Sequence, residues 1–284
     1  MITFLSDYGV SDDFVGVCHG VIASICPEAR LIDVTHGIPR HDVRAGAVVL
    51  REALPYMPRG VHLAVVDPGV GSRRRAVALK LGDGRLLVGP DNGLLWPVAQ
   101  AAGGVAEAVD IGSSRYRLEP VSATFHGRDI FAPVAARLAA GTALLQAGDP
   151  CDPEQLVALE LPEPRVEDGT VVAHVLYVDR FGNLQLDAGQ AEMAAMELRL
   201  GEAVVVEVAG SAPSLKPGPR SAAPSDGSRS FECPYVVTFA DVGAGELLVY
   251  EDSYGRLAIA VRGGSAADRL EVVADDEVKI RRPG

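Results

Sequence analysis

Residues 1–162 alternate short apolar runs with longer segments in which apolar residues recur at helical spacing. The run at residues 61–66 is predominantly apolar, as expected for a parallel strand that is buried on both faces. The β-α-β-α-β order predicts an α/β N-terminal domain, residues 1–162, in which helices flank a mainly parallel sheet. The expected strands are residues 2–5, 31–34, 61–66, 76–81, 86–88 and 105–109, and the expected helices are residues 14–25, 43–54 and 130–140.

The pattern changes at Leu161-Pro162-Glu163-Pro164, a run of prolines and acids that is typical of a linker. Beyond it, Gly and Asp separate short alternating segments, and strong helical periodicity is mostly absent. We therefore predict a smaller antiparallel β domain, residues 168–284. Residues 211–230, rich in Ser, Pro, Gly and Ala, are typical of a mobile surface loop. The expected strands of this domain are residues 170–178, 203–208, 235–239, 246–250 and 257–261.

The net charge of −12 argues against a nucleic-acid surface, which needs a face rich in Lys and Arg. Such acidity is compatible with a cationic small-molecule substrate, although many proteins are simply acidic. No apolar run approaches the ~20 residues that a membrane span needs, and no basic segment precedes an N-terminal apolar stretch. We therefore expect a soluble cytoplasmic protein with neither a nucleic-acid nor a membrane partner.

The cysteines and histidines indicate neither a redox framework nor a metal centre. The four cysteines are scattered and form no C-x-x-C pair. His19, His36, His41, His62 and His174 lack the spacing of metal ligands, and a proline lies between His36 and His41. We therefore predict no metal.

Polar turns follow several of the expected strands, which is where ligand groups collect in open α/β sheets. Taken singly, each has an ordinary structural explanation. Asp7 and Asp67 suit turns, His126 could be a core histidine, and Arg74 belongs to a run of arginines that solvent would surround. Their common placement at strand ends favours a site. The turns are Ser6-Asp7-Tyr8-Gly9, residues 66–74, Gly89-Pro90-Asp91-Asn92-Gly93, Phe125-His126-Gly127-Arg128-Asp129 and Asp179-Arg180-Phe181-Gly182-Asn183.

The standard catalytic and nucleotide-binding motifs are absent from the sequence. No G-x-G-x-x-G follows a strand, and there is no phosphate-binding P-loop, no H-E-x-x-H and no G-x-S-x-G. The usual dinucleotide-binding, zinc-protease and serine-hydrolase classes therefore find no support.

The order of the polar turns resembles that of the S-adenosyl-L-methionine (SAM) hydroxide adenosyltransferases, the adenosine-forming relatives of the SAM-dependent fluorinase and chlorinase. The resemblance extends from Ile2 to about Leu270. Any one motif is weak evidence, but six in the family's order are specific. Besides the turns above, the motifs include Thr35-His36-Gly37-Ile38-Pro39-Arg40-His41-Asp42-Val43 and Ser253-Tyr254-Gly255-Arg256-Leu257-Ala258-Ile259-Ala260.

The resemblance implies that water attacks the ribose 5′ carbon of SAM and yields adenosine and L-methionine, with SAM as the substrate and no cofactor. It implies a catalytic constellation of Asp67, Arg74 and His126. It also implies a homotrimer whose sites lie between the N-terminal domain of one subunit and the C-terminal domain of the next. The implied substrate contacts are Asp7 for ribose, Asp179 for methionine, Phe181 and Asn183 for adenine, Ser253 near the methionine carboxylate, and the backbone around Arg262 as an adenine wall.

Two departures weaken the contacts expected from the last motif. The family often has Asn-x-Phe-Gly where this chain has Asp252-Ser253-Tyr254-Gly255, and Asn where it has Arg262. Three alternatives remain: a halogenase of the same fold, a SAM-dependent methyltransferase, and a SAM- or adenosine-binding sensor without turnover. The halogenases lack the Asp and His of the constellation and carry an extra loop, for which the short path from Gly93 to Val105 leaves no room.

Overall fold

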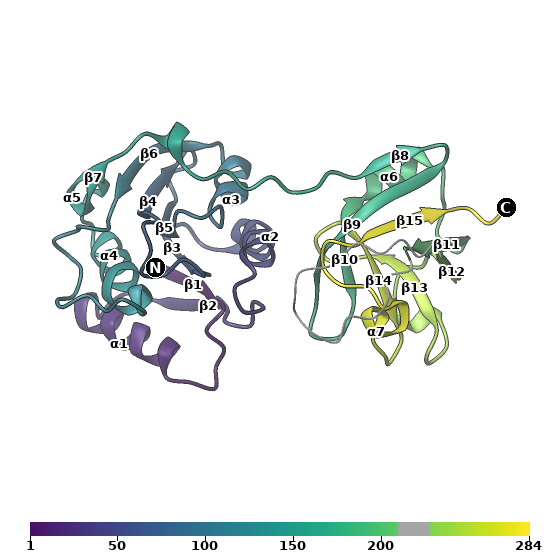
Figure 1. Cartoon of the computed structure of the whole chain (residues 1–284), viewed down its shortest axis with the longest axis horizontal. Helices are drawn as coiled ribbons and strands as arrows, with labels where there is room; N and C mark the ends of the chain where they lie inside the picture. Colours follow the sequence, from purple (N-terminus) through teal and green to yellow (C-terminus); the bar gives the residue numbers. More distant parts are fainter. Residues whose placement is uncertain (210–227) are drawn as a thin grey trace. The chain divides into compact units, whose positions relative to one another are not determined.

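The computed structural model describes residues 1–209 and 228–284, which form two compact units, Met1–Leu161 and Pro162–Gly284 (Figure 1). The loop expected at residues 211–230 lies mostly outside the described residues, although residues 229 and 230 already belong to a strand. Among the described residues, no helix is both long and apolar enough to span a bilayer.

A seven-stranded sheet forms the centre of the first unit, in the order β2-β1-β3-β5-β4-β6-β7. The strands β2, β1, β3 and β5 pair parallel, whereas β4, β6 and β7 pair antiparallel. The sheet is therefore mixed, and the expectation of a mainly parallel sheet is correct only on one side. The bounds are β1 Ile2–Ser6, β2 Leu31–Thr35, β3 Val61–Val65, β4 Ala76–Leu81, β5 Leu86–Pro90, β6 Val105–Asp110 and β7 Asp149–Pro150.

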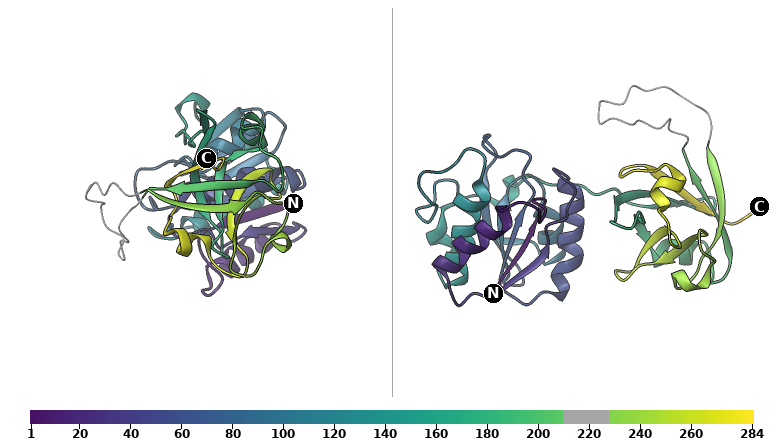
Figure 2. Two further views of the ribbon diagram at one scale, coloured as in Figure 1. Left: turned by 90° about the vertical axis from the view of Figure 1, so that its right-hand side faces the viewer. Right: turned by 90° about the horizontal axis from the view of Figure 1, so that it is seen from below.

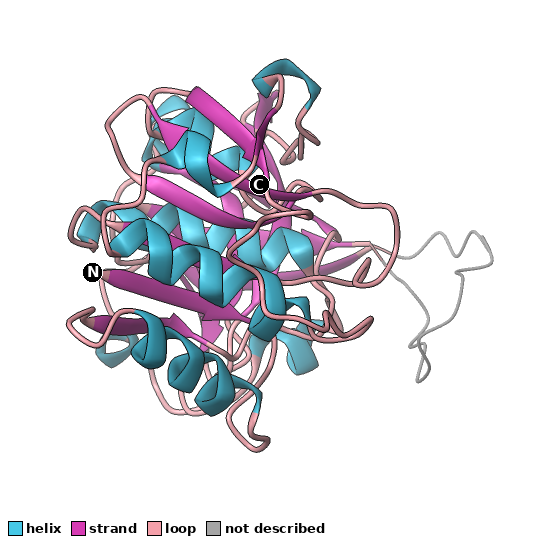
Figure 3. Cartoon of the chain, turned by 90° about the vertical axis from the view of Figure 1, so that its left-hand side faces the viewer, coloured by secondary structure: helices cyan, strands magenta, loops and turns pink. Residues whose placement is uncertain are grey.

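Helices cover both faces of this sheet. The helices α1 and α4 pack together on one face, and α2 and α3 pack together on the other. Figure 2 shows both helical layers, and Figure 3 shows helices lying beside the strands. Every residue of β1 and β3 is buried, because the helical layers exclude water from both faces of these strands. The bounds are α1 Phe14–Ile25, α2 Val43–Ala53, α3 Trp96–Ala101, α4 Ala132–Ala139 and α5 Leu144–Ala147, with a π-helical turn η2 Gly127–Phe131 and 3-10 turns η1 Leu54–Tyr56 and η3 Pro153–Gln155.

The second unit is an antiparallel sheet with the strand order β12-β11-β15-β9-β10-β14-β13, and β8 pairs with β9. Tyr235, directly after β12, bridges Val249 of β13, so the two ends of the path approach each other. The bounds are β8 Arg165–Glu167, β9 Thr170–Val178, β10 Leu184–Gly189, β11 Ala203–Val208, β12 Arg229–Pro234, β13 Leu247–Glu251, β14 Arg256–Val261 and β15 Glu277–Arg281, with helices α6 Gln190–Ala195 and α7 Ala266–Leu270 and a 3-10 turn η4 Phe239–Asp241.

The strand expected at residues 235–239 was wrong. Only Tyr235 makes a bridge there, and the chain then bends into η4, where the Asp241 carboxylate accepts a hydrogen bond from the Thr238 backbone at 3.0 Å. Val237 of the same apolar run is exposed. An aspartate that caps a turn has outweighed the strand propensity of the run before it.

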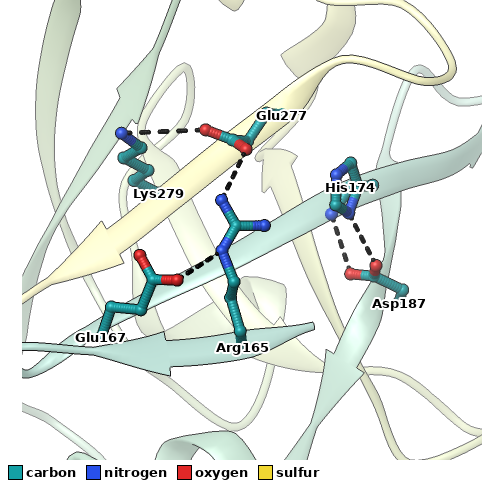
Figure 4. Close-up of polar contacts among 6 residues, drawn as sticks. All are labelled: Arg165, Glu167, His174, Asp187, Glu277 and Lys279. Carbon is teal, nitrogen blue, oxygen red and sulfur yellow. Dashed lines mark hydrogen bonds and ion pairs between the residues drawn. The ribbon is translucent and has the colours of Figure 1, made fainter. Parts of the chain in front are cut away.

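Several polar pairs lie on the strands of the second unit (Figure 4). Arg165 contacts Glu167 and Glu277, but both ion pairs are exposed and contribute little. The contact of His174 with Asp187 is better protected, because one Asp187 oxygen accepts the His174 backbone N–H at 2.8 Å and the other lies 3.0 Å from His174 Nδ1. Burial, partly offset by His174, raises the pKa of Asp187.

Candidate functional site

A tight turn after β3 brings Arg74 back to Asp67. Asp67 follows the buried Val66, and the Ser72 backbone N–H donates to the Gly69 carbonyl at 3.0 Å as the chain reverses. Arg74 then donates from Nε to Asp67 Oδ1 at 2.9 Å and from Nη2 to Asp67 Oδ2. The two side chains are only 10% and 6% exposed, so a two-pronged ion pair is held nearly out of solvent.

His126 completes this cluster from 52 residues further along the chain. It immediately precedes the π-helical turn η2, and Arg74 Nη2 lies 2.9 Å from its Nδ1. A guanidinium has only N–H donors, so Nδ1 must accept, and the neutral ring carries its proton on Nε2. Burial, followed by the neighbouring Arg74, lowers the pKa of His126, and Asp67 and Asp129 oppose that change. The cluster therefore consists of a carboxylate, a fixed cation and a neutral imidazole whose Nε2–H is a donor.

Asp7 lies in the turn after β1. Its Oδ2 accepts the His41 backbone N–H at 2.9 Å, and Gly9, at φ +70°, donates its N–H to the His36 carbonyl. The turn is thus tied to the segment after β2. Both strands end at this edge of the sheet, where carboxyl ends of parallel strands meet.

Tyr8 and Gly127 are two neighbours that the sequence analysis did not single out as functional. Burial raises the pKa of the Tyr8 phenol well above its usual value; Cys18, Asp7 and Asp67 raise it further, and Arg74 opposes them. A Cβ at Gly127 would overlap the Tyr8 hydroxyl, so only glycine fits beside His126. The direct succession of Tyr8 after Asp7 was the one available signal for Tyr8.

The turn at Asp91 and Asn92 supports the site's framework. Asn92 Nδ2 donates to the Val66 carbonyl at 2.8 Å, directly before Asp67, and Asp91 accepts Arg75 Nε and the Val157 backbone N–H, both at 2.8 Å. These groups satisfy backbone and side-chain partners within the unit. They fix where β3 ends.

In the second unit, Asp179 organises the turn between β9 and β10. Its Oδ1 accepts the backbone N–H groups of Phe181 and Asn183 at 2.8 and 3.0 Å, and its Oδ2 accepts Asn183 Nδ2 at 2.8 Å. The Phe181 ring is 65% exposed, whereas Asn183 is buried. One turn therefore brings together three of the predicted substrate-binding residues and presents an aromatic face to solvent.

Ser253 and Arg262 lie elsewhere in the second unit. Ser253 is exposed in the turn between β13 and β14, where Asp252 Oδ1 accepts the Tyr254 and Arg256 backbone N–H groups at 2.8 and 2.9 Å. Arg262 follows β14, and its Nη1 donates to the Val242 carbonyl. Neither side chain contacts the turn of Asp179 through any hydrogen bond found among the described residues.

Two family models match the chain. The SAM hydroxide adenosyltransferase N-terminal domain matches residues 2–148, and the corresponding C-terminal domain matches residues 173–279. The chain therefore belongs to the SAM hydroxide adenosyltransferase family.

Individual relatives agree with this membership. A protein named (R)-S-adenosyl-L-methionine hydrolase from Salinispora tropica is 50% identical over 98% of this chain and 97% of its own. A crystal structure of an uncharacterized conserved protein from Thermotoga maritima superposes with a TM-score of 0.86 at 37% identity and covers 99% of this chain and 100% of its own. A fluorinase from Nocardia brasiliensis is 28% identical over 99% of this chain and 96% of its own.

Proposed function

We propose that this protein hydrolyses (R)-S-adenosyl-L-methionine to adenosine and L-methionine by attack of water on the ribose 5′ carbon. The observation that carries the proposal is the protected Asp67–Arg74–His126 cluster in a chain that is 50% identical to a named hydrolase. The prefix L already defines the α carbon, so (R) in that name describes the sulfonium sulfur. We extend that configuration to the substrate of this chain.

The chemistry needs a well-placed nucleophile more than an acid. The water oxygen forms a bond to C5′ while the C5′–S bond breaks. The electron pair of the broken bond goes to sulfur. The sulfonium then leaves as the neutral thioether of L-methionine and requires no protonation. The attacking water must lose one proton, so the protein has to orient that water and remove a proton in a site that excludes bulk solvent.

The hydrogen bonds of the cluster suggest how its members divide this work. His126 Nδ1 accepts from Arg74, and a guanidinium does not deprotonate, so neither group is free to take the proton there. Asp67 is the anionic member, and each of its oxygens retains a second lone pair beyond the bond to Arg74. We assign Asp67 as the acceptor of the water's proton and His126 Nε2–H as a donor that orients the water.

The remaining predicted residues hold the substrate. One carboxylate can accept hydrogen bonds from two vicinal hydroxyls, which suits Asp7 for ribose, and the exposed Phe181 ring suits adenine stacking. Asp179 fits the methionine ammonium by charge, and Asn183 Oδ1 offers an acceptor, since its amide nitrogen donates to Asp179. Ser253 for the methionine carboxylate and the backbone around Arg262 for adenine complete the assignment.

The experiment that tests the reaction combines both sulfonium epimers with labelled water. The protein is incubated with (R)- or (S)-SAM in H₂¹⁸O containing chloride, and the products are analysed by mass spectrometry. We expect adenosine carrying ¹⁸O at the 5′ position, together with unlabelled L-methionine, mainly from the (R) epimer. A 5′-chloro product would instead show a halogenase, S-adenosylhomocysteine a methyltransferase, and intact bound SAM a sensor.

Variants test the assigned roles. Asp67→Asn should lower kcat by at least about 10², within the range for a lost general base, while SAM affinity measured by calorimetry changes much less. His126→Ala should likewise lower kcat while SAM affinity changes much less. The control is His41→Asn, because the His41 side chain is exposed and Asn tolerates its positive φ. Equal turnover of the Asp67 variant and the control would contradict the assignment.

We also propose a homotrimer in which each site takes Asp67 from one subunit and Asp179 from the next. Coexpression of two inactive variants, Asp67→Asn and Asp179→Ala, tests this arrangement. Random assembly would give about a quarter of the sites both intact halves and about that share of wild-type activity. If each site were built within a single chain, no site would have both intact halves and no activity would be recovered. A cytoplasmic location and the lack of nucleic-acid and membrane partners stay predictions.

A further inference from the structure

Three side chains of the first unit converge at the edge of the sheet. His19 projects from α1, Asp33 lies in the edge strand β2, and His36 follows that strand directly. Asp33 Oδ1 lies 2.9 Å from His19 Nε2 and 3.0 Å from His36 Nε2. The potential ligand atoms of all three residues lie within 4.8 Å of one another.

The environment of His36 points to a ligand. Its side chain is only 4% exposed, and no group of the described residues forms a hydrogen bond with its Nε2, although Asp33 Oδ1 lies 3.0 Å away. Its Nδ1 lies 2.7 Å from Ser6 Oγ, and the ring packs edge-on against Phe4. A histidine that binds a metal is commonly fixed in this way, with one ring nitrogen in a hydrogen bond and the other directed at the ion.

We propose that His19, Asp33 and His36 form a binding site for a borderline transition-metal dication such as Zn²⁺. Two imidazoles and one carboxylate are a donor set that zinc takes up, with a fourth position left for water. Ligand atoms on a tetrahedral zinc ion lie about 3.4 Å apart, given metal–ligand distances near 2.1 Å. The two separations from Asp33 Oδ1 are 2.9 and 3.0 Å, and the ligand atoms of the two histidines lie within 4.8 Å of each other, so side-chain rotations would bring all three atoms to that spacing.

The exposure of His19 and Asp33 suits entry of an ion. Side chains of His19 and Asp33 are 30% and 42% exposed and can adjust, whereas His36 is held by Ser6 and Phe4. Sequence spacing could not reveal this set, because its members come from a helix, a strand and a turn. The proposal therefore departs from our expectation that the chain binds no metal.

The site is separate from the Asp67–Arg74–His126 cluster but connected to the turn of Asp7. The His36 carbonyl accepts the Gly9 backbone N–H at 2.8 Å, so an ion held by His36 would restrain that turn. The ion would join α1 to β2 and to the segment after it. Its expected effect is stabilisation of this edge of the unit, with no part in the bond-breaking step.

The test is calorimetric titration of Zn²⁺ into untagged, chelator-treated full-length protein, together with the visible spectrum of the Co²⁺ form. We expect one Zn²⁺ per chain, Co²⁺ bands typical of a four- or five-coordinate site, and a rise in Tm on Zn²⁺ addition. His19→Ala and Asp33→Asn should each weaken Zn²⁺ affinity by at least about 100-fold, more than loss of an outer-shell partner usually causes. Both residues are partly exposed, so neither variant should unfold the chain.

The matched control is His174→Ala, which removes a second protected histidine–aspartate contact that, within the described part of the chain, belongs to no cluster of three such groups. It should leave Zn²⁺ affinity and the Co²⁺ spectrum unchanged. Failure of the wild-type protein to bind Zn²⁺ would overturn the proposal. So would wild-type affinity in the His19 and Asp33 variants, or an equal loss in the control, because binding would then depend on other groups.

Discussion

Lowering the pH from 7.5 to 5 should destabilise the first unit through the buried histidine His62. This residue lies in β3, is 0% exposed, and its Nδ1 is 2.8 Å from Thr3 Oγ1 on the paired strand β1. Among the residues that the structure describes, its Nε2 has no hydrogen-bond partner. Burial, assisted by Arg85 and opposed by Asp83, lowers the pKa of His62 from 6.5 to about 4. The folded state therefore requires the neutral ring.

The sign and size of the effect follow from proton linkage. Below pH 6.5 the unfolded chain binds a proton at His62, whereas the folded chain binds it only near pH 4. The unfolding free energy therefore falls as the pH falls through this window. The complete loss is about 3 kcal/mol, and about 2 kcal/mol of it is reached by pH 5. Against a typical unfolding free energy of about 5–15 kcal/mol, that loss is large.

Urea unfolding monitored by tryptophan fluorescence can isolate this contribution. Trp96, the single tryptophan of the sequence, lies in α3 and reports on the first unit. The unfolding free energy is measured at pH 7.5 and pH 5, at one protein concentration, for wild type, His62→Gln and the exposed control His41→Asn. We expect a pH-dependent loss about 2 kcal/mol smaller in His62→Gln than in the other two. An equal loss in all three would refute the reasoning.

Further predictions concern packing and the Asp67–Arg74–His126 cluster. Gly127→Ala should lower the unfolding free energy by about 1–3 kcal/mol, because the new methyl group overlaps the Tyr8 hydroxyl. Gly20→Ala, in the open middle of α1, should raise the unfolding free energy by about 0.5–1 kcal/mol. Urea unfolding measures both changes, and an unchanged unfolding free energy of the Gly127 variant would contradict the packing. Arg74→Lys should lower kcat on the order of 10², because an ammonium cannot reproduce the fork to Asp67 together with the contact to His126; a steady-state assay with unchanged kcat would contradict this reading.

The long, strongly patterned elements of the first unit could be predicted from sequence, and the short ones could not. Residues 14–25 form a helix with the predicted bounds, because twelve residues give the periodicity room to appear. Trp96–Ala101 is half that length and contains a proline, so no period could be recognised. The hairpin of β4 and β5 could have been predicted from the sequence, because residues 82–85 are too few for a parallel crossover. Since the hairpin was overlooked, the sheet was predicted to be mainly parallel.

The same distinction applies to the candidate site. Asp67 and Arg74 are seven residues apart, and a glycine-containing turn joins them, so their contact is local. His126 is 52 residues away, and nothing in its own segment specifies Arg74 as its partner. Only the family's order of motifs suggested that contact. No motif predicted the cluster of His19, Asp33 and His36, because its members come from a helix, a strand and a turn that meet at one edge of the sheet.

The three consecutive arginines show why charge runs cannot be interpreted as units. Arg73 is exposed, Arg74 is held by Asp67, and Arg75 is held by Asp91, so neighbouring guanidinium groups have different environments. Removing an ion pair from water costs several kcal/mol per charge, and a well-packed apolar pair would often stabilise the fold as much or more. The nearly buried pair of Asp67 and Arg74 is therefore poorly explained by stability. It fits the function that we propose, which needs a carboxylate held in place beside an imidazole whose proton lies on Nε2.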